Sequence, residues 1–377
     1  MVRAVEWRRA VFAPVFAALG LIWACSSADL KTTNSSQNAS GGASGEDPGA
    51  TTDPDGGTQA DGAPITDPGD GPPAASQGVT IQVQPTDNGL ALVNAIKGAK
   101  KSVHMEMYLL SSDEIVTALV NLKKAGKEVK VILNQNFPPN GGSNTDSFNA
   151  LKAGGVSVVW SPQGYTFTHA KTILIDGEKL IVMTMNLTFT SASTNREYIA
   201  TDTDPDDVAD AEKIFDADFK NIDIQLPTTK LVLSPGAATK VNAETKLANL
   251  IGSAKTSLDV EVQSLSDDTI VGAIVKAKNN GVAVRVVLDA DTLNSDGQEN
   301  AVKTLKTNGV PTRAVTSPDI HAKAIVVDGA LAFVGSQNMT PTALFMNREV
   351  GVVTNATTEI SKITKAISSD WAKGSAP

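Results

Sequence analysis

HAKTILID, at residues 169–176, recurs as HAKAIVVD at residues 321–328, so both stretches read His-x-Lys-x4-Asp. The chain has only three histidines, and two of them hold this same position. Side chains alternate along a β-strand, so His169 and Lys171 would share one face, as would His321 and Lys323. The Asp-Gly pairs that follow, at 176–177 and 328–329, predict turns into a second strand.

The repetition extends outward from these stretches. AKKSVHMEM at residues 99–107 matches AKTSLDVEV at 254–262, and an amphipathic helix follows each, ending at Gly126 and Gly281. We expect strands at 129–133 and 282–288, helices ending near Gly155 and Gly309, and strand pairs that begin at the two histidines. Both copies close with Asn-Arg-Glu, at 195–197 and 347–349, then a strand and a helix ending at 218–219 and 370–371.

Two copies of one unit of about 150 residues, a usual domain size, therefore make up the folded chain. Strands separated by helices predict the α/β class. We expect two similar α-β-α sandwich units with mixed β-sheets, related by a pseudo-twofold axis, with the active site at their interface. The expected boundaries are 79–227 and 228–377, and the expected state is a monomer with an internal pseudo-dimer.

The repeated residue types favour phosphoryl transfer. Neutral imidazole is a competent nucleophile near pH 7, and protonated imidazole is a good acid for a leaving oxygen. A lysine and an asparagine from each half would stabilise the charge on the nonbridging phosphate oxygens. The strand after each histidine stretch supplies the asparagines, Asn186 and Asn338. No Walker loop, GxGxxG element or metal cluster is evident, so we expect no cofactor and no metal.

These paired stretches resemble the HKD motifs of the phospholipase D superfamily over about residues 80–376. The resemblance implies a metal-independent reaction through a phosphohistidine, with His169 as nucleophile and His321 as acid. It also implies that Glu197 and Glu349 orient the imidazoles. The residues carried over from the motif, by role, are the catalytic set His169, His321, Lys171, Lys323, Asp176 and Asp328, and the phosphate-binding set Lys171, Lys323, Asn186, Asn338, Ser336 and Thr184. For Asp176 and Asp328 we expect a local structural role rather than contact with the substrate.

Some repeated positions leave alternatives open. The second copy has Gly335-Ser-x-Asn, whereas the first has Met183-Thr184-x-Asn, and the bulk of Met183 would narrow the cleft or reduce activity. Glu106 and Glu261 either line the cleft behind the histidines or end the sheet as polar residues. Glu197 and Glu349 could also be solvated strand residues. His104 lacks a repeat partner and is assigned a structural role.

The N-terminal part of the chain predicts export. Three arginines precede a short apolar run at residues 11–24, which ends at Cys25, the only cysteine. The segment 1–25 resembles a signal peptide with a lipoprotein box, so Cys25 would be lipidated; ordinary signal cleavage stays open because Trp23 is unusual there. Residues 26–78 lack aromatics and predict a disordered acidic tether that carries most of the net charge of −9.

The leading hypothesis is an exported phosphodiester hydrolase that removes phospholipid head groups and gives phosphatidic acid. It would be anchored to the cell envelope by lipid, or secreted if the box is unused. One alternative is a nuclease of the same superfamily, with nucleic acid as substrate, although the chain has no net basic footprint. Another is a catalytically weak surface binding or scaffold protein, suggested by Met183.

Overall fold

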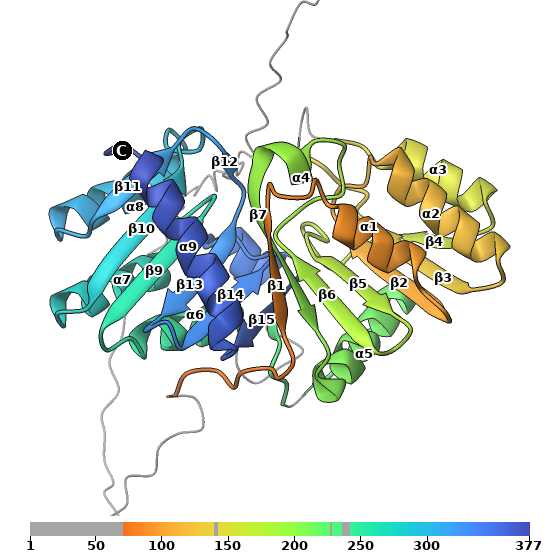
Figure 1. Cartoon of the computed structure of the whole chain (residues 1–377), viewed down its shortest axis with the longest axis horizontal. Helices are drawn as coiled ribbons and strands as arrows, with labels where there is room; N and C mark the ends of the chain where they lie inside the picture. Colours follow the sequence, from red (N-terminus) through yellow and green to blue (C-terminus); the bar gives the residue numbers. More distant parts are fainter. Residues whose placement is uncertain (1–70, 139–141, 227, 236–241) are drawn as a thin grey trace, which may run out of the picture.

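The computed structural model describes residues 71–138, 142–226, 228–235 and 242–377. The predicted signal segment, Cys25 and most of the tether lie outside these residues. Figure 1 shows two units side by side, with the first unit in orange to green and the second in cyan to blue. The predicted α/β class with two similar units and mixed sheets is confirmed.

Among the described residues, the first unit contains seven strands and five helices. They are β1 (Thr80–Gln84), α1 (Leu90–Lys97), β2 (Ser102–Met107), α2 (Asp113–Lys124), β3 (Glu128–Leu133), α3 (Thr145–Ala153), β4 (Ser157–Trp160), β5 (Lys171–Ile175), β6 (Lys179–Met183), α4 (Ser191–Thr194), β7 (Asn195–Asp202) and α5 (Pro205–Lys220).

The second unit repeats this order with small additions. Its elements are β8 (Val232–Ser234), α6 (Ala243–Gly252), β9 (Ser257–Val262), α7 (Asp268–Asn279), β10 (Ala283–Asp289), α8 (Asp296–Thr307), β11 (Thr312–Val315), β12 (Asp319–Ile320), β13 (Lys323–Val327), β14 (Leu331–Gly335), the π-helix η2 (Thr342–Met346), β15 (Glu349–Thr354) and α9 (Thr357–Lys373).

The two sheets have the same topology. The first runs β1-β7-β6-β5-β2-β3-β4, and the second, taken from the equivalent edge, runs β8-β15-β14-β13-β9-β10-β11. In each sheet the last three strands are parallel and the remaining pairs are antiparallel. One strand crosses between units: β12 of the second unit pairs with β7 of the first. The sequence repeat is therefore a repeat of topology.

Local sequence signals account for the element ends. Ser112 accepts a hydrogen bond from the Ile115 amide at the start of α2, and Asp267 accepts from the Ile270 amide at the start of α7. Such caps each contribute about 1 kcal/mol. The turn residues Asp176 and Asp328 both have positive φ, 61° and 54°, and each precedes a glycine of positive φ. The predicted Asp-Gly turns between paired strands are confirmed.

Within the described part of the chain, three apolar clusters form the core. Two lie on the outer faces of the sheets, one under α1 and α2 and the other under α6 and α7. The third contains residues of both sheets together with α5 and α9, so the units share one core. Full burial of one such side chain contributes roughly 1.5–3 kcal/mol, and the shared core therefore fixes the units against each other. In Figure 1, β1 and α9 lie side by side along this junction.

The end of the predicted tether differs from expectation. Ser76 is 1% exposed, and its amide donates to the Val353 carbonyl at 2.7 Å. The Gln77 amide donates to the Asp204 carboxylate at 3.1 Å. These residues are small and polar, so their composition predicts a disordered tether. Their backbone amides nevertheless form hydrogen bonds with the folded units. The folded part thus begins before residue 79.

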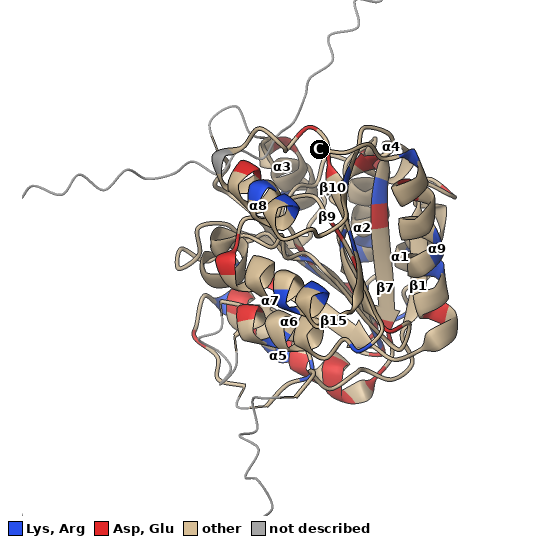
Figure 2. Cartoon of the chain, turned by 90° about the vertical axis from the view of Figure 1, so that its left-hand side faces the viewer, with Lys and Arg blue, Asp and Glu red and all other residues tan. Residues whose placement is uncertain are grey.

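Figure 2 shows acidic and basic residues distributed along the helices and strands of the chain, viewed from the side of the second unit. Within the described residues no helix is long and apolar enough to cross a bilayer.

Candidate active site

His169 and His321 stand at the junction of the two units. The predicted strand pairs begin two residues later than expected, at Lys171 and Lys323, so each histidine directly precedes its strand. The His169 amide donates to the Arg348 carbonyl of the other unit at 2.9 Å. His321 follows β12, which pairs with Asn195 and Arg196 of the first unit. Backbone of the opposite unit therefore binds His169 directly and binds the strand that precedes His321.

The carboxylate partners of the imidazoles are exchanged between the units. The Nδ1 atom of His169 lies 2.8 Å and 2.9 Å from the two oxygens of Glu349. The Nδ1 atom of His321 lies 2.8 Å from Glu197 Oε1, which is close enough for an ion pair. The angle between the two groups does not meet that of a hydrogen bond. Both glutamates are 0% exposed, so they are not solvated strand residues. Because Nδ1 of each ring faces a carboxylate, Nε2 is the ring nitrogen that can react with a substrate.

Further side chains position these glutamates. The Thr184 hydroxyl donates to Glu197, and its oxygen accepts from the Tyr198 amide at 2.9 Å. The side-chain Nδ2 group of Asn347 donates a hydrogen bond to Glu349 Oε1 at 3.1 Å. The predicted phosphate-binding hydroxyls, Thr184 and Ser336, are both 0% exposed, and Ser336 bonds the backbone of Val350. We therefore assign these two hydroxyls to support of the site rather than to phosphate contact.

Both motif lysines are completely buried. Lys171 donates to the His169 carbonyl at 2.7 Å, and Lys323 donates to the His321 carbonyl at 2.7 Å. The Lys171 ammonium lies 5.1 Å from the centre of the Tyr108 ring, whereas Lys323 lies 3.3 Å from Gln263 Oε1. Two buried ammonium groups place positive charge at the junction, which favours the binding of an anion there.

The asparagines complete the set from equivalent positions. Asn186 and Asn338 follow β6 and β14, and each has a buried Oδ1 atom with no hydrogen-bond partner in the described part of the chain. Oδ1 is an acceptor, so it cannot bind a phosphate oxygen, which is an acceptor too. The Nδ2 group of each amide is the donor that could bind one.

The electrostatic setting keeps both imidazoles neutral before substrate arrives. Burial lowers the pKa of His169 to about 4, against the opposing effect of Glu349, and Lys171 and Lys323 lower it further. Burial also lowers the pKa of His321, with Lys323 and Lys171 acting in the same direction and Glu197 opposing. Each histidine senses both lysines, so the two motifs converge on one locality. An arriving phosphodiester anion would raise both pKa values.

Asp176 and Asp328 lie away from this locality. Asp176 accepts hydrogen bonds from the backbone amides of residues 100–102, and Asp328 accepts from those of residues 255–257. Each stands at the far end of a five-residue strand from its lysine, about 17 Å along the chain. Their assignment to the catalytic set is therefore wrong, and their role is to secure a turn against the preceding strand.

Met183 does not narrow the cleft. It is 0% exposed and packs in the outer apolar cluster under α1 and α2. In the second unit the equivalent Gly335 faces Gly351 across the strands, and a Cβ on Gly335 would lie 2.6 Å from the Phe333 ring. A side chain at Gly335 would therefore collide with Phe333, whereas Met183 packs within the outer cluster of the first unit. The reason for expecting a catalytically weak protein is therefore removed.

Two buried networks behind the histidines went undetected in the sequence. Arg348 bonds Asp218 at 2.7 Å and 3.0 Å, and Arg196 bonds Asp370, so the arginines of both Asn-Arg-Glu motifs also cross between units. The repetition of Asn-Arg-Glu was a signal for these pairs, but spacing gives no partner. Tyr108, whose ring centre lies 4.6 Å from that of His169, had no sequence signal.

The remaining acidic and histidine candidates have structural positions. Glu106 and Glu261 are buried behind the site, where burial raises the pKa of both, that of Glu261 to about 8. His104 stacks on Phe215 and contacts Glu212 and Glu128, as its structural assignment predicted. Among the described residues no group of histidine, cysteine and acidic side chains could hold a metal ion.

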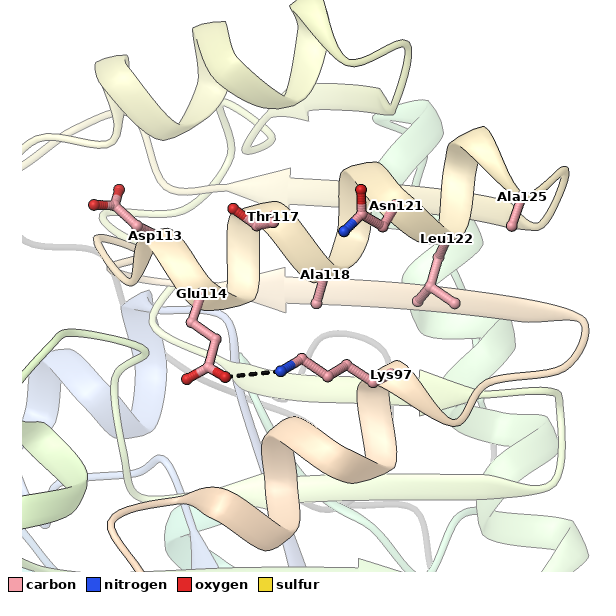
Figure 3. Close-up of a pocket in the computed structure, with 8 residues that line it drawn as sticks. All are labelled: Lys97, Asp113, Glu114, Thr117, Ala118, Asn121, Leu122 and Ala125. Atoms are coloured by element: carbon pink, nitrogen blue, oxygen red, sulfur yellow. Dashed lines mark hydrogen bonds and ion pairs between the residues drawn. The ribbon is translucent and has the colours of Figure 1, made fainter.

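A separate surface hollow lies between α1 and α2, on the outer side of the first unit. Figure 3 shows Lys97 and Glu114 paired across it at 2.8 Å. Both side chains are about half exposed, so the pair contributes little. This hollow contains none of the motif residues.

Comparisons with known proteins agree with this geometry. The family model described as "Cardiolipin synthase, PLD-like domain" matches residues 92–219 and 247–371, one stretch in each unit. Mitochondrial cardiolipin hydrolase of Danio rerio is 29% identical over 115 residues, which cover 30% of this chain and 49% of that protein. The corresponding hydrolase of Chlamydomonas reinhardtii is 29% identical over 104 residues, 28% of this chain and 46% of the relative. The chain thus spans about half the length of these relatives.

One solved structure covers most of both chains. Phosphatidylserine synthase of Haemophilus influenzae superposes with a TM-score of 0.65 at 11% identity, over 82% of this chain and 90% of the other. At this identity the similarity shows the fold alone.

Proposed function

Because the chain belongs to the PLD-like domain family of the phospholipase D superfamily, we propose that it cleaves phosphodiester bonds and that phospholipids are its substrates. The observation that carries this proposal is the exchange of partners at the junction, where each buried imidazole has its Nδ1 against a glutamate of the other unit. Two buried lysines lie beside these imidazoles.

In the first step, Nε2 of His169 attacks phosphorus while the bond to the leaving alcohol oxygen breaks. His321, protonated when the anion binds, gives its proton to that oxygen. Lys171, Lys323, Asn186 and Asn338 stabilise the charge on the nonbridging oxygens. In the second step, His321, now neutral, takes a proton from water, which attacks phosphorus and releases His169. The products are phosphatidic acid and the free head-group alcohol.

The assignment of His169 as nucleophile has structural support. Glu349 contacts its Nδ1 with both oxygens, whereas Glu197 contacts His321 with one. A carboxylate that contacts Nδ1 with both oxygens better stabilises the positive charge that the His169 ring acquires when its Nε2 bonds to phosphorus.

The test is phosphorus-31 NMR of mixed phospholipid vesicles incubated with the full chain in EDTA. We expect phosphatidic acid with the wild type, and none with His169→Ala or His321→Ala. His104→Gln is the matched control, because it alters the one other histidine and should keep activity. Phospholipids unchanged by the wild type would contradict the substrate assignment.

A trapping experiment separates the two histidine roles. His321→Ala lacks both the acid of the first step and the base of the second, so the substrate for this variant is a phosphatidyl ester of 4-nitrophenol, whose leaving group needs no proton. A phosphatidyl adduct should then accumulate on His169, visible as an added mass in the intact protein. An adduct on any other residue would overturn the assignment of the nucleophile.

We also propose that the protein is exported and anchored by lipid at Cys25, on the strength of the sequence pattern alone. Detergent phase separation of bacterial extracts tests this. The wild type should enter the detergent phase and Cys25→Ser should not, and equal partitioning of both would contradict the anchor.

A further inference from the structure

Two loops form the rim next to the histidines. Residues 186–195 run from Asn186 to the start of β7, where Asn195 pairs with β12 just before His321. Residues 338–347 run from Asn338 to Asn347, and the Met346 carbonyl accepts from the Thr166 amide just before His169. In Figure 1, α4 of the first loop and β12 meet between the two units.

These loops expose large apolar side chains. Phe189 is 91% exposed, Met346 is 51% exposed and Phe345 is 41% exposed. Only two other large hydrophobic residues are this exposed within the described part of the chain, Leu90 and Ile222. Single exposed apolar residues are normal, but a group that borders a reaction centre marks an interaction surface.

Neither loop carries a charged residue. Residues 186–195 read NLTFTSASTN and residues 338–347 read NMTPTALFMN, in a chain that is 19% charged. An uncharged rim with exposed phenylalanine and methionine loses little hydration when it enters the headgroup region of a membrane.

The apolar surface continues inward on the side of His169. The Tyr108 ring lies 4.6 Å from His169, 5.0 Å from Phe137 and 6.0 Å from Phe167, measured between ring centres. The backbone carbonyl of Phe167 accepts a hydrogen bond from the amide of Arg348, which directly follows the second loop. Aromatic side chains thus lie beside His169, and the backbone of Phe167 connects this group to the end of the second loop.

The side of His321 has the opposite character. Gln263 and Asp319 stand at the repeat positions of Tyr108 and Phe167. Asn134 Oδ1 accepts from the Thr168 amide in the first unit, and Asp289 Oδ1 accepts from the Ile320 amide at the equivalent place in the second. Asp319, which is exposed, places negative charge near His321, and this opposes a polyanion such as nucleic acid as the occupant.

We propose that Phe189, Phe345 and Met346 dock the rim on a phospholipid bilayer, with the acyl-bearing side of the lipid against the aromatic residues beside His169. This rests on the proposed function for its substrate class, but the docking itself is measurable without turnover. The attraction is apolar, so it should persist when the salt concentration is raised.

Two triple variants of the full chain test the proposal, each in a Cys25→Ser background so that no lipid anchor contributes. One carries Phe189→Ser, Phe345→Ser and Met346→Ser, and the other carries leucine at the same three positions. Exposed side chains contribute little to folding, so both should fold. Leucine keeps the apolar surface but removes the aromatic rings, which separates insertion into lipid from stacking on bases.

We expect the serine variant to bind phosphatidylcholine vesicles about thirtyfold more weakly in a flotation assay, equivalent to about 2 kcal/mol. The leucine variant should bind within about threefold of the Cys25→Ser parent. Hydrolysis of the soluble diester bis(4-nitrophenyl) phosphate should be unchanged in both, because these side chains do not contact the phosphate.

The outcomes distinguish this proposal from the proposed function. Vesicle binding that the serine changes leave unaltered overturns the docking surface, even if lipids are hydrolysed. Binding that is lost with serine and kept with leucine supports it, even if no lipid is turned over. Loss of single-stranded DNA binding in both variants, with vesicle binding unchanged, overturns it in favour of a base-stacking surface.

Discussion

Replacing His169 with alanine and Glu349 with glutamine, singly and together, measures the contact that crosses between the units. The two Glu349 oxygens lie 2.8 Å and 2.9 Å from His169 Nδ1, and Glu349 is 0% exposed. A hydrogen bond to a charged group contributes about 1.5–3 kcal/mol. Asn347 still donates to Glu349 when the imidazole is gone. We therefore expect a coupling energy near the lower end, about 1–2 kcal/mol.

The assay is urea unfolding at pH 7, followed by tryptophan fluorescence, for the wild type, both single variants and the double variant. Since the pKa of His169 is about 4, the ring is neutral at this pH, and the coupling reports the hydrogen bond rather than an ion pair. The matched control pairs Glu349→Gln with His321→Ala. These two residues belong to the same repeat, and their coupling should stay below about 0.5 kcal/mol.

The result that refutes the exchange is coupling in the control pair and none between Glu349 and His169. Each unit would then supply both the imidazole and its carboxylate, and the site would not depend on the junction. Equal coupling in both pairs would instead show that the charge of Glu349 acts on both rings through space, without the specific contact.

Three further predictions follow from buried positions. Burial raises the pKa of Glu261 to about 8 from 4.5, so its contribution to stability is complete below pH 4.5 and is lost as pH rises through 8. Glu261→Gln should remove up to about 4 kcal/mol of this decline in urea unfolding between pH 5 and 9, and an unchanged slope would count against the assignment. Met183→Ala should lower the free energy of unfolding by about 2–5 kcal/mol with kcat unchanged, and a gain in activity would show that Met183 does obstruct the cleft. Gly335→Ala should destabilise by about 1–3 kcal/mol because the new Cβ would lie 2.6 Å from the Phe333 ring and 2.8 Å from the Gly351 Cα, whereas Gly164→Ala, with open space around it, should leave the unfolding midpoint unchanged.

The sequence by itself determined the repeat, the α/β class and the two His-Lys pairs. These features are local or periodic: alternation along a strand, glycine at helix ends, and Asp-Gly turns all act within a few residues. A motif that occurs at equivalent positions of a repeat can also be recognised without knowing which residues are in contact. For this reason the equivalent elements of the two units could be predicted within a few residues.

Only the tertiary structure decided which residues meet across the junction. Glu349 belongs to the repeat of His321, yet it contacts His169, and Arg348 pairs with Asp218 of the first unit in the same way. Met183 illustrates the same limit, since the sequence shows its bulk but not the face of the sheet on which it packs. Such contacts join residues far apart in the chain, and their choice depends on how the shared core packs the two sheets together, which no spacing records.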